Sequence, residues 1–160
     1  MGCVTVSPRF VVDTMLGRLA RWLRALGYDT LYLGQAEDRR LLQLARAEER
    51  ILITRDRRLA RLAEPHGCLI RSELVDEQLR EAVAHLALAP RSDDWLSRCL
   101  ECNARLEARA REGVRELVPE HIFATHTEFT SCAACAKIYW AGSHADRMLE
   151  RLGRLFGGQS

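Results

Sequence analysis

The sequence predicts an α/β fold, with a doubly wound parallel sheet followed by a small metal-bound domain. Over the first 90 residues, short apolar segments alternate four times with amphipathic segments, which is typical of a parallel sheet covered by helices. After that point, two Cys-x-x-Cys pairs replace the long apolar runs, a pattern typical of a metal site. We therefore expect two domains, residues 1–90 and 91–160, with a boundary near Ala89-Pro90-Arg91-Ser92.

Composition narrows the class of protein. The chain has 160 residues, of which 48% are hydrophobic, enough for one domain and a mini-domain. Its net charge is +2, so charge alone does not favour a nucleic-acid partner. No apolar run approaches the roughly 18 residues of a membrane span, and the N-terminus lacks a signal-peptide core. We expect a cytoplasmic protein with no membrane partner.

The first expected strand, Phe10–Val12, is apolar throughout and ends at Asp13. A helix is expected from Thr14 to Gly27, because leucines recur three, four and three residues apart and so share one helical face. These are Leu16, Leu19, Leu23 and Leu26. Gly27 suits the cap at the end of this helix. Residues 30–33 form the second expected strand.

The next segments continue the alternation. A second helix is expected from Asp38 to Glu48, with the Asp38 carboxylate near the positive end of the helix dipole. The strand Ile51–Thr54 starts with three apolar residues, which indicates a strand covered on both faces. The remaining expected elements are a helix at 57–64, broken by Pro65, a strand at 68–70 and a helix at 73–88.

Three aspartates are expected to meet at one edge of this sheet. A strand order of 2-1-3-4 places Asp13 and Asp56 across the switch point between the first and third strands. The second helix runs antiparallel to the strands, so this helix begins at the same edge, and its first residue is Asp38. Clustered carboxylates suit Mg²⁺ or Mn²⁺. In the alternative interpretation each acid has a local role: Asp38 caps a helix, and the other two cap or end turns.

The cysteines indicate a zinc ribbon. Two knuckles, Cys99-x-x-Cys102 and Cys132-x-x-Cys135, supply the four thiolates of a tetrahedral, saturated and hence structural zinc site. A redox role for one pair is the alternative. Two cysteines are left over: Cys3 is expected to be an exposed terminal residue, and Cys68 a core residue of a strand.

The last segments complete the expected elements. A short helix is expected after Pro119, within residues 117–125, and a strand over residues 137–140. A final helix is expected over Ser143–Phe156, with Ser143 as its cap.

Several motifs together resemble a known family. They are Asp13, the stretch 16–29, Asp38-x-x-Leu41-Leu42-x-x-Ala45, Thr54-Arg55-Asp56, Cys99-x-x-Cys102-Asn103, Cys132-x-x-Cys135 and Tyr139-Trp140-x-Gly142-Ser143-His144. They resemble the Mut-seven C-terminal RNase domain family over residues 10–152. The resemblance implies a PIN-like nuclease fold followed by a zinc ribbon, and metal-dependent cleavage of RNA. It implies that Asp13, Asp38 and Asp56 bind the catalytic Mg²⁺ or Mn²⁺.

Other roles stay open. Many PIN nucleases use a fourth acid; no motif supplies it here, and the neighbouring acids are Glu37, Glu73 and Asp76. Candidate substrate-binding residues are Arg18, Arg21, Thr54 and Arg55, and Arg24 could also line a phosphate path, although a solvated helix face is an equal reading of the helix arginines. The alternative function is a non-catalytic RNA- or protein-binding zinc-ribbon module. A phosphoacceptor receiver is excluded, because the sole lysine, Lys137, lies in the ribbon.

Overall fold

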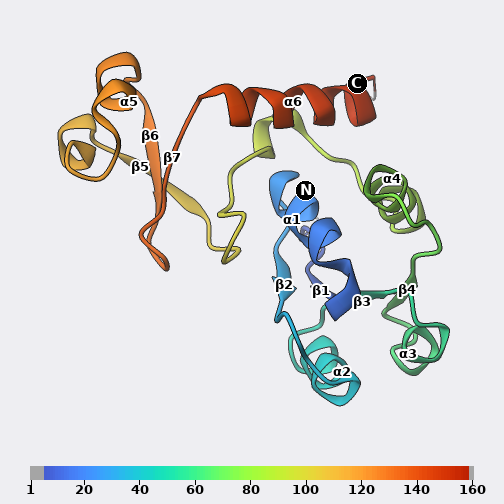
Figure 1. Ribbon diagram of the computed structural model, residues 1–160. Helices are drawn as coiled ribbons and strands as arrows, with labels where there is room; N and C mark the ends of the chain where they lie inside the picture. The colour runs from blue at the N-terminus through green and yellow to red at the C-terminus, as the bar shows by residue number, and fades with distance from the viewer. Residues whose placement is uncertain (1–5, 159–160) are drawn as a thin grey trace, which may run out of the picture.

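The computed structural model describes residues 6–158, and its first half is built on a four-stranded parallel sheet (Figure 1). The strands are β1 (Phe10–Val12), β2 (Thr30–Tyr32), β3 (Ile51–Thr54) and β4 (Gly67–Leu69). Their order is β2-β1-β3-β4, so β1 pairs with β2 on one side and with β3 on the other. This confirms the predicted α/β fold and its 2-1-3-4 strand order. Cys3 lies outside the described residues.

The helices follow the expected positions with shifted ends. They are α1 (Gly17–Ala25), α2 (Asp38–Ala47), α3 (Arg57–Leu62) and α4 (Val75–His85). The expected helix at 14–27 begins with a 3-10 turn, η1 (Thr14–Leu16), because the Asp13 side chain accepts a hydrogen bond from the first backbone N–H of the turn. Gly27 follows α1 with a φ of +95°, a left-handed conformation that favours glycine.

Alternate residues of the strands bury on opposite faces of the sheet. Phe10 and Val12 belong to the core beneath α1 and α4, whereas Val11 faces the helices α2 and α3. The second core adds Leu41 and Leu59 from those two helices. One face is therefore covered by α1 and α4 and the other by α2 and α3, which is the doubly wound arrangement. Cys68 is a buried residue of β4, as expected, and burial raises the pKa of its thiol to about 11.

The second half forms a separate three-stranded antiparallel sheet, drawn in yellow and orange in Figure 1. Its strands are β5 (Leu106–Arg109), β6 (Phe129–Cys132) and β7 (Ile138–Trp140), in the order β5-β6-β7. Its short helices are η2 (Ser92–Asp94), η3 (Arg111–Val114) and α5 (Glu120–Thr125). The sequence predicted α5 and β7 but not the other two strands.

The last helix returns to the first sheet. Helix α6 (Ser143–Phe156) has the predicted bounds, but the prediction that Ser143 caps it was wrong. Gly142 occupies the cap position and no side chain bonds the first turn, because Ser143 is already the first helical residue. Met148, Leu152 and Phe156 are buried in the same core as Phe10, as the position of α6 beside α1 and α4 suggests (Figure 1). A domain boundary near residue 90 stays a prediction.

A polar seam joins the two halves. Arg24 was expected to lie on a solvent or phosphate-facing side of its helix, but it is buried. Its guanidinium donates to the carbonyl oxygens of Thr30, Leu100 and Glu101 at 2.9–3.0 Å. Asn103 accepts a 2.8 Å hydrogen bond from Thr30 N, at the edge strand β2. The first cysteine knuckle is therefore fastened to the end of α1 and the start of β2. Within residues 6–158, no helix combines the length and apolar character needed to cross a membrane.

Candidate metal centres of the sheet edge and the cysteine cluster

Asp13 and Asp56 follow neighbouring strands at the carboxyl edge of the parallel sheet. Asp13 comes directly after β1, and Asp56 lies two residues beyond β3. Thr54, the buried last residue of β3, connects them. Its hydroxyl donates a 2.6 Å hydrogen bond to Asp13 Oδ2 and accepts a 2.9 Å hydrogen bond from Asp56 N. The structure thus places two of the three predicted acids at the switch point of the sheet.

Both of these acids also have local roles. Asp13 is only 5% exposed, and its Oδ1 accepts a 2.7 Å hydrogen bond from Thr14 N. Asp56 caps α3 by accepting a 2.9 Å hydrogen bond from Leu59 N at Oδ1. These bonds fix each carboxylate in direction, and they match the capping roles of the alternative interpretation. Capping does not exclude a role in metal binding, because a carboxylate has several lone pairs.

Asp38 differs from the other two. It is the first residue of α2 and is exposed, and within residues 6–158 its side chain makes no hydrogen bond or ion pair. Glu37 occupies the cap position of this helix, so the expectation that Asp38 is the cap was wrong. In this part of the chain, only the four cysteines bring three or more potential ligand atoms within 4.8 Å of one another. The three aspartates therefore share the edge at a wider spacing.

The neighbouring acids have different partners. Asp76 forms a 2.6 Å ion pair with Arg151 of α6, which gives it a role in holding that helix. Glu73 is 84% exposed and lies 3.5 Å from Arg55. Glu37 is exposed at the start of α2. None of the three is fixed toward the pair joined by Thr54.

The expected substrate-binding arginines also differ in environment. Arg18 is exposed, with no ion-pair partner among the described residues. Arg21 instead forms a 2.6 Å ion pair with Glu101, inside the first cysteine knuckle. Arg55 is 35% exposed beside Glu73. Arg18 and Arg55 lie on segments that adjoin the aspartates, whereas Arg21 points to the knuckle.

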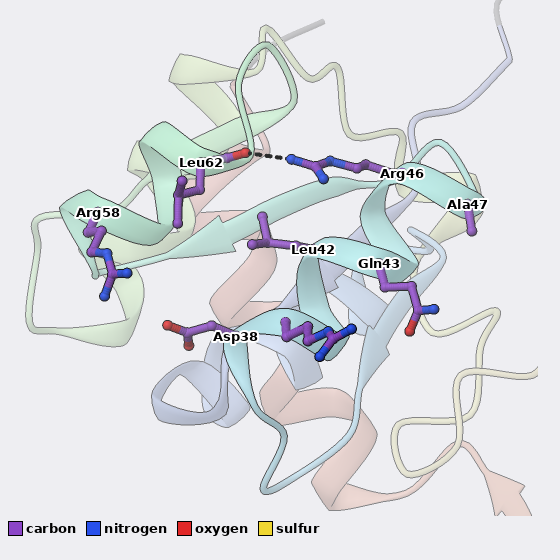
Figure 2. Close-up of a pocket in the computed structure, with 8 residues that line it drawn as sticks. Asp38, Leu42, Gln43, Arg46, Ala47, Arg58 and Leu62 are labelled. Atoms are coloured by element: carbon purple, nitrogen blue, oxygen red, sulfur yellow. Dashed lines mark hydrogen bonds between the residues drawn. The ribbon is translucent and has the colours of Figure 1, made fainter.

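A hollow that the sequence did not reveal lies between α2 and α3. Its volume is about 740 Å³, and Figure 2 shows its lining. The lining residues are Asp38, Arg39, Leu42, Gln43, Arg46, Ala47, Arg58 and Leu62. Arg46 reaches across the hollow and donates a 3.2 Å hydrogen bond to the carbonyl oxygen of Leu62. In sequence these arginines look like the solvated faces of two ordinary helices, so the hollow becomes visible only when the helices pack together.

The four predicted cysteines form one cluster. Cys99 Sγ lies 3.7 Å from Cys135 Sγ, and Cys102 Sγ lies 3.1 Å from Cys132 Sγ. A tetrahedral zinc with Zn–S bonds of about 2.3 Å has S–S edges of about 3.8 Å. The cluster therefore has the donor chemistry and nearly the size of a Cys₄ zinc site. The knuckles are the turn 99–102 and the turn that joins β6 to β7.

Neighbouring groups favour thiolate at Cys99. Burial by itself would raise the pKa of this thiol, but hydrogen bonds from Tyr139 and from the backbone N–H groups of Cys102 and Glu101 lower its pKa to about 6. Tyr139 Oη lies 3.1 Å from Cys99 Sγ. Because a metal binds thiolate rather than thiol, these donors favour the metal-binding form of Cys99. The sequence did not identify Tyr139 as a partner of the cluster.

Comparison with known proteins gives two matches. The family model described as Mut7-C RNAse domain matches residues 8–152. A Homo sapiens protein described as Exonuclease mut-7 homolog is 35% identical to the chain over 104 residues. That match covers 59% of this chain and 12% of the relative, so the chain spans only a small part of the relative's length. No solved structure matches the chain.

Proposed function

Because the chain belongs to the Mut7-C RNAse domain family, we propose that it is a divalent-metal-dependent ribonuclease acting at the carboxyl edge of its parallel sheet. The observation that carries this proposal is the pair Asp13 and Asp56, joined through Thr54 at the switch point. The exposed carboxylate of Asp38 begins α2 at the same edge. We propose these three aspartates as the acids that hold Mg²⁺ or Mn²⁺.

The oxygen ligands that the three aspartates offer suit magnesium chemistry. Mg²⁺ usually keeps several waters and binds through one or two carboxylates together with substrate phosphate oxygens. The ion would activate a water and stabilise the charge that develops during phosphodiester cleavage. Asp13, which is buried and held by two hydrogen bonds, keeps a fixed geometry. The side chain of Asp38, which is exposed and unbonded within the described residues, is free to move toward a bound cation.

The cysteine cluster is proposed to hold one structural zinc ion. Four thiolates leave no open coordination position for a substrate, so this site would stabilise the fold rather than take part in cleavage. The chain would thus use two kinds of metal, a soft site of sulfur ligands and a hard site of oxygen ligands. RNA is the proposed substrate.

The test exploits the isolation of Asp38. We expect Asp38→Asn to lower Mn²⁺-dependent cleavage of a labelled RNA by at least about 100-fold, because a metal ligand that acts in the transition state is lost. Its thermal stability should stay within about 0.5 kcal/mol of wild type, since no described hydrogen bond is broken. Asp146→Asn is the matched control, because Asp146 is also exposed in the first turn of a helix, α6.

The outcomes separate the candidate functions. Equal cleavage by wild type and Asp38→Asn would remove Asp38 from the site. Wild-type protein that binds RNA but cleaves none, with Mg²⁺ or Mn²⁺ present, would instead support the non-catalytic binding module.

A further inference from the structure

The hollow between α2 and α3 opens toward the proposed site. Helices in this fold run antiparallel to the strands, so both α2 and α3 begin at the carboxyl edge. Asp38 and Arg58 mark that end of the hollow, and Arg46 and Leu62 mark the other end (Figure 2). The hollow therefore leads away from the aspartates along one face of the sheet. Its far end lies beyond the reach of a scissile phosphate held by the aspartates.

Unpaired positive charge lines this hollow. The lining contains three arginines, Arg39, Arg46 and Arg58, and one acid, Asp38. Within residues 6–158, no carboxylate lies within 4 Å of any of the three. Other arginines, such as Arg21 with Glu101, are paired with an acid, and Arg18 is unpaired among the described residues, but the hollow brings three unpaired arginines onto one concave surface. A concave surface with uncompensated arginines attracts phosphates, which guanidinium groups bind in pairs of hydrogen bonds.

The length of the hollow fits a short stretch of a strand. Asp38 and Arg46 are eight residues apart in one helix, which corresponds to about 12 Å at about 1.5 Å per residue. Stacked nucleotides follow one another at about 3.4 Å, so the hollow spans about three of them. Leu62, 46% exposed at the far end, offers an apolar contact for a base or ribose. A pocket of about 740 Å³ between two helices holds a few nucleotides of one strand rather than a duplex.

We propose that the hollow between α2 and α3 binds the backbone of single-stranded RNA on one side of the scissile phosphate, through Arg39, Arg46 and Arg58. This inference rests on the proposed ribonuclease function. Its consequence is that RNA long enough to fill the hollow binds more tightly than RNA that only reaches the aspartates. The three arginines are binding residues and take no part in the chemical step.

The first measurement is binding without cleavage. The affinity of a fluorescent 12-nucleotide RNA is measured by anisotropy without added Mg²⁺ or Mn²⁺, with salt varied between about 50 and 200 mM. Each phosphate contact on a single strand contributes about −0.7 to the slope of log K against log salt concentration. We expect a triple variant (Arg39→Gln, Arg46→Gln, Arg58→Gln) to flatten this slope by about 2, which is about 100-fold in affinity near 0.1 M salt. Each single variant should flatten it by about 0.7.

The second measurement compares cleavage of an RNA that fills the hollow with cleavage of one too short to fill it. In Mn²⁺, the triple variant should lose kcat/KM on the 12-nucleotide RNA and keep wild-type cleavage of a trinucleotide. Arg147→Gln is the matched control, because Arg147 is an exposed arginine of α6, which packs on the opposite face of the sheet. It should change neither binding nor cleavage. A melting curve for the triple variant confirms that it is folded.

The possible results are distinct. An unchanged salt slope in the triple variant, or an equal loss of affinity in Arg147→Gln, overturns the assignment of the hollow. So does displacement of the RNA by a polyglutamate peptide at equal charge concentration, which would point to an acidic protein instead. If the triple variant cleaves both the trinucleotide and the longer RNA as wild type does, the ribonuclease proposal stands and the proposed role of the hollow is wrong. If RNA binding depends on the hollow but wild type cleaves no RNA, the hollow is an RNA-binding site and the ribonuclease proposal is wrong.

Discussion

Thr54 makes a single unit of two aspartates that are 43 residues apart in sequence. Its one hydroxyl proton is donated to Asp13, and its oxygen accepts the backbone N–H of Asp56. Because Thr54 is buried at the end of β3, packing holds its rotamer. The hydrogen bonds of its hydroxyl group therefore hold both acids in place. A site fixed by a strand is more precise than one carried by a loop.

We expect Thr54→Val to destabilise the protein by about 1–3 kcal/mol, because it leaves buried Asp13 without one of its two donors. It should also lower metal-dependent cleavage, whereas Thr54→Ser, which restores the hydroxyl, should recover both properties. Urea unfolding and RNA cleavage measure the two effects. Wild-type stability and activity in the valine variant would show that the hydroxyl does not organise the site.

Single residues also show where sequence reasoning was sufficient. Asp13 and Asp56 could be located because an apolar strand pattern ends directly before Asp13 and another ends shortly before Asp56. The partner of Arg21 could not, because Glu101 is 80 residues away and reaches it only when the knuckle docks on α1. The same holds for Tyr139, whose contact with Cys99 depends on the antiparallel pairing of the ribbon.

At the scale of elements, the first cysteine knuckle and the start of β2 share a hydrogen-bonded junction. Asn103 has a φ of +74°, a left-handed conformation that asparagine tolerates better than most residues. This turn directs its amide at the sheet, where it donates a 2.8 Å hydrogen bond to Asp29 Oδ1. Arg50 donates to the same oxygen at 2.6 Å. Asp29 is thus the point where helix, strand and knuckle meet.

This junction predicts a dependence on pH. Burial would raise the pKa of Asp29, but the hydrogen bonds from Arg50 and Asn103 outweigh it and lower the pKa below its usual value of about 3.8. A carboxyl whose folded pKa is depressed stabilises the protein above its unfolded pKa, and this contribution is lost as pH falls through the folded value. We expect wild type to lose stability below about pH 4 more steeply than Asp29→Asn. Parallel unfolding curves at pH 2.5–7 measure the difference, and equal slopes would contradict it.

Elements were predictable in proportion to the local pattern that encodes them. The helix leucines and the apolar strands of the first sheet carry strong periodic signals, so the parallel, doubly wound sheet followed from β-α alternation. Strand β6 carries no such signal, because its sequence, Phe129-Thr130-Ser131-Cys132, has little apolar alternation. It exists because it pairs with β5 and β7 and ends at a cysteine of the cluster. Such long-range causes are absent from a local window.

At the scale of the molecule, the cysteine cluster supports more than the ribbon. The carbonyls of Leu100 and Glu101, inside the first knuckle, hold buried Arg24. Losing the knuckle would leave this guanidinium buried with two bonds missing, a costly arrangement. The ribbon and the parallel sheet are therefore coupled in stability.

We expect Cys132→Ser, or removal of metal by a strong chelator, to lower the melting temperature of the whole chain in one transition. Elemental analysis of untreated protein should give one zinc per chain. Near-UV circular dichroism in a Trp140→Phe background can follow Trp22 and Trp95, which pack against the core of the first sheet, as reporters of that half, because Trp140 packs in the second half. A sheet that melts at the wild-type temperature without metal would show that the halves are independent.

Helix α6 determines when the core of the first sheet can be completed during synthesis. Leu152, which is fully buried, and Phe156 complete the core that Phe10 begins, so the earliest strand is covered by the latest helix. A nascent chain that has emerged only as far as residue 142 carries an apolar surface that its own later residues must close. On the ribosome, this surface is open to chaperones until the last turn of α6 emerges. Stalled chains ending before and after α6 should therefore differ sharply in protease resistance across residues 10–88, although the cleavable segment is the same in both.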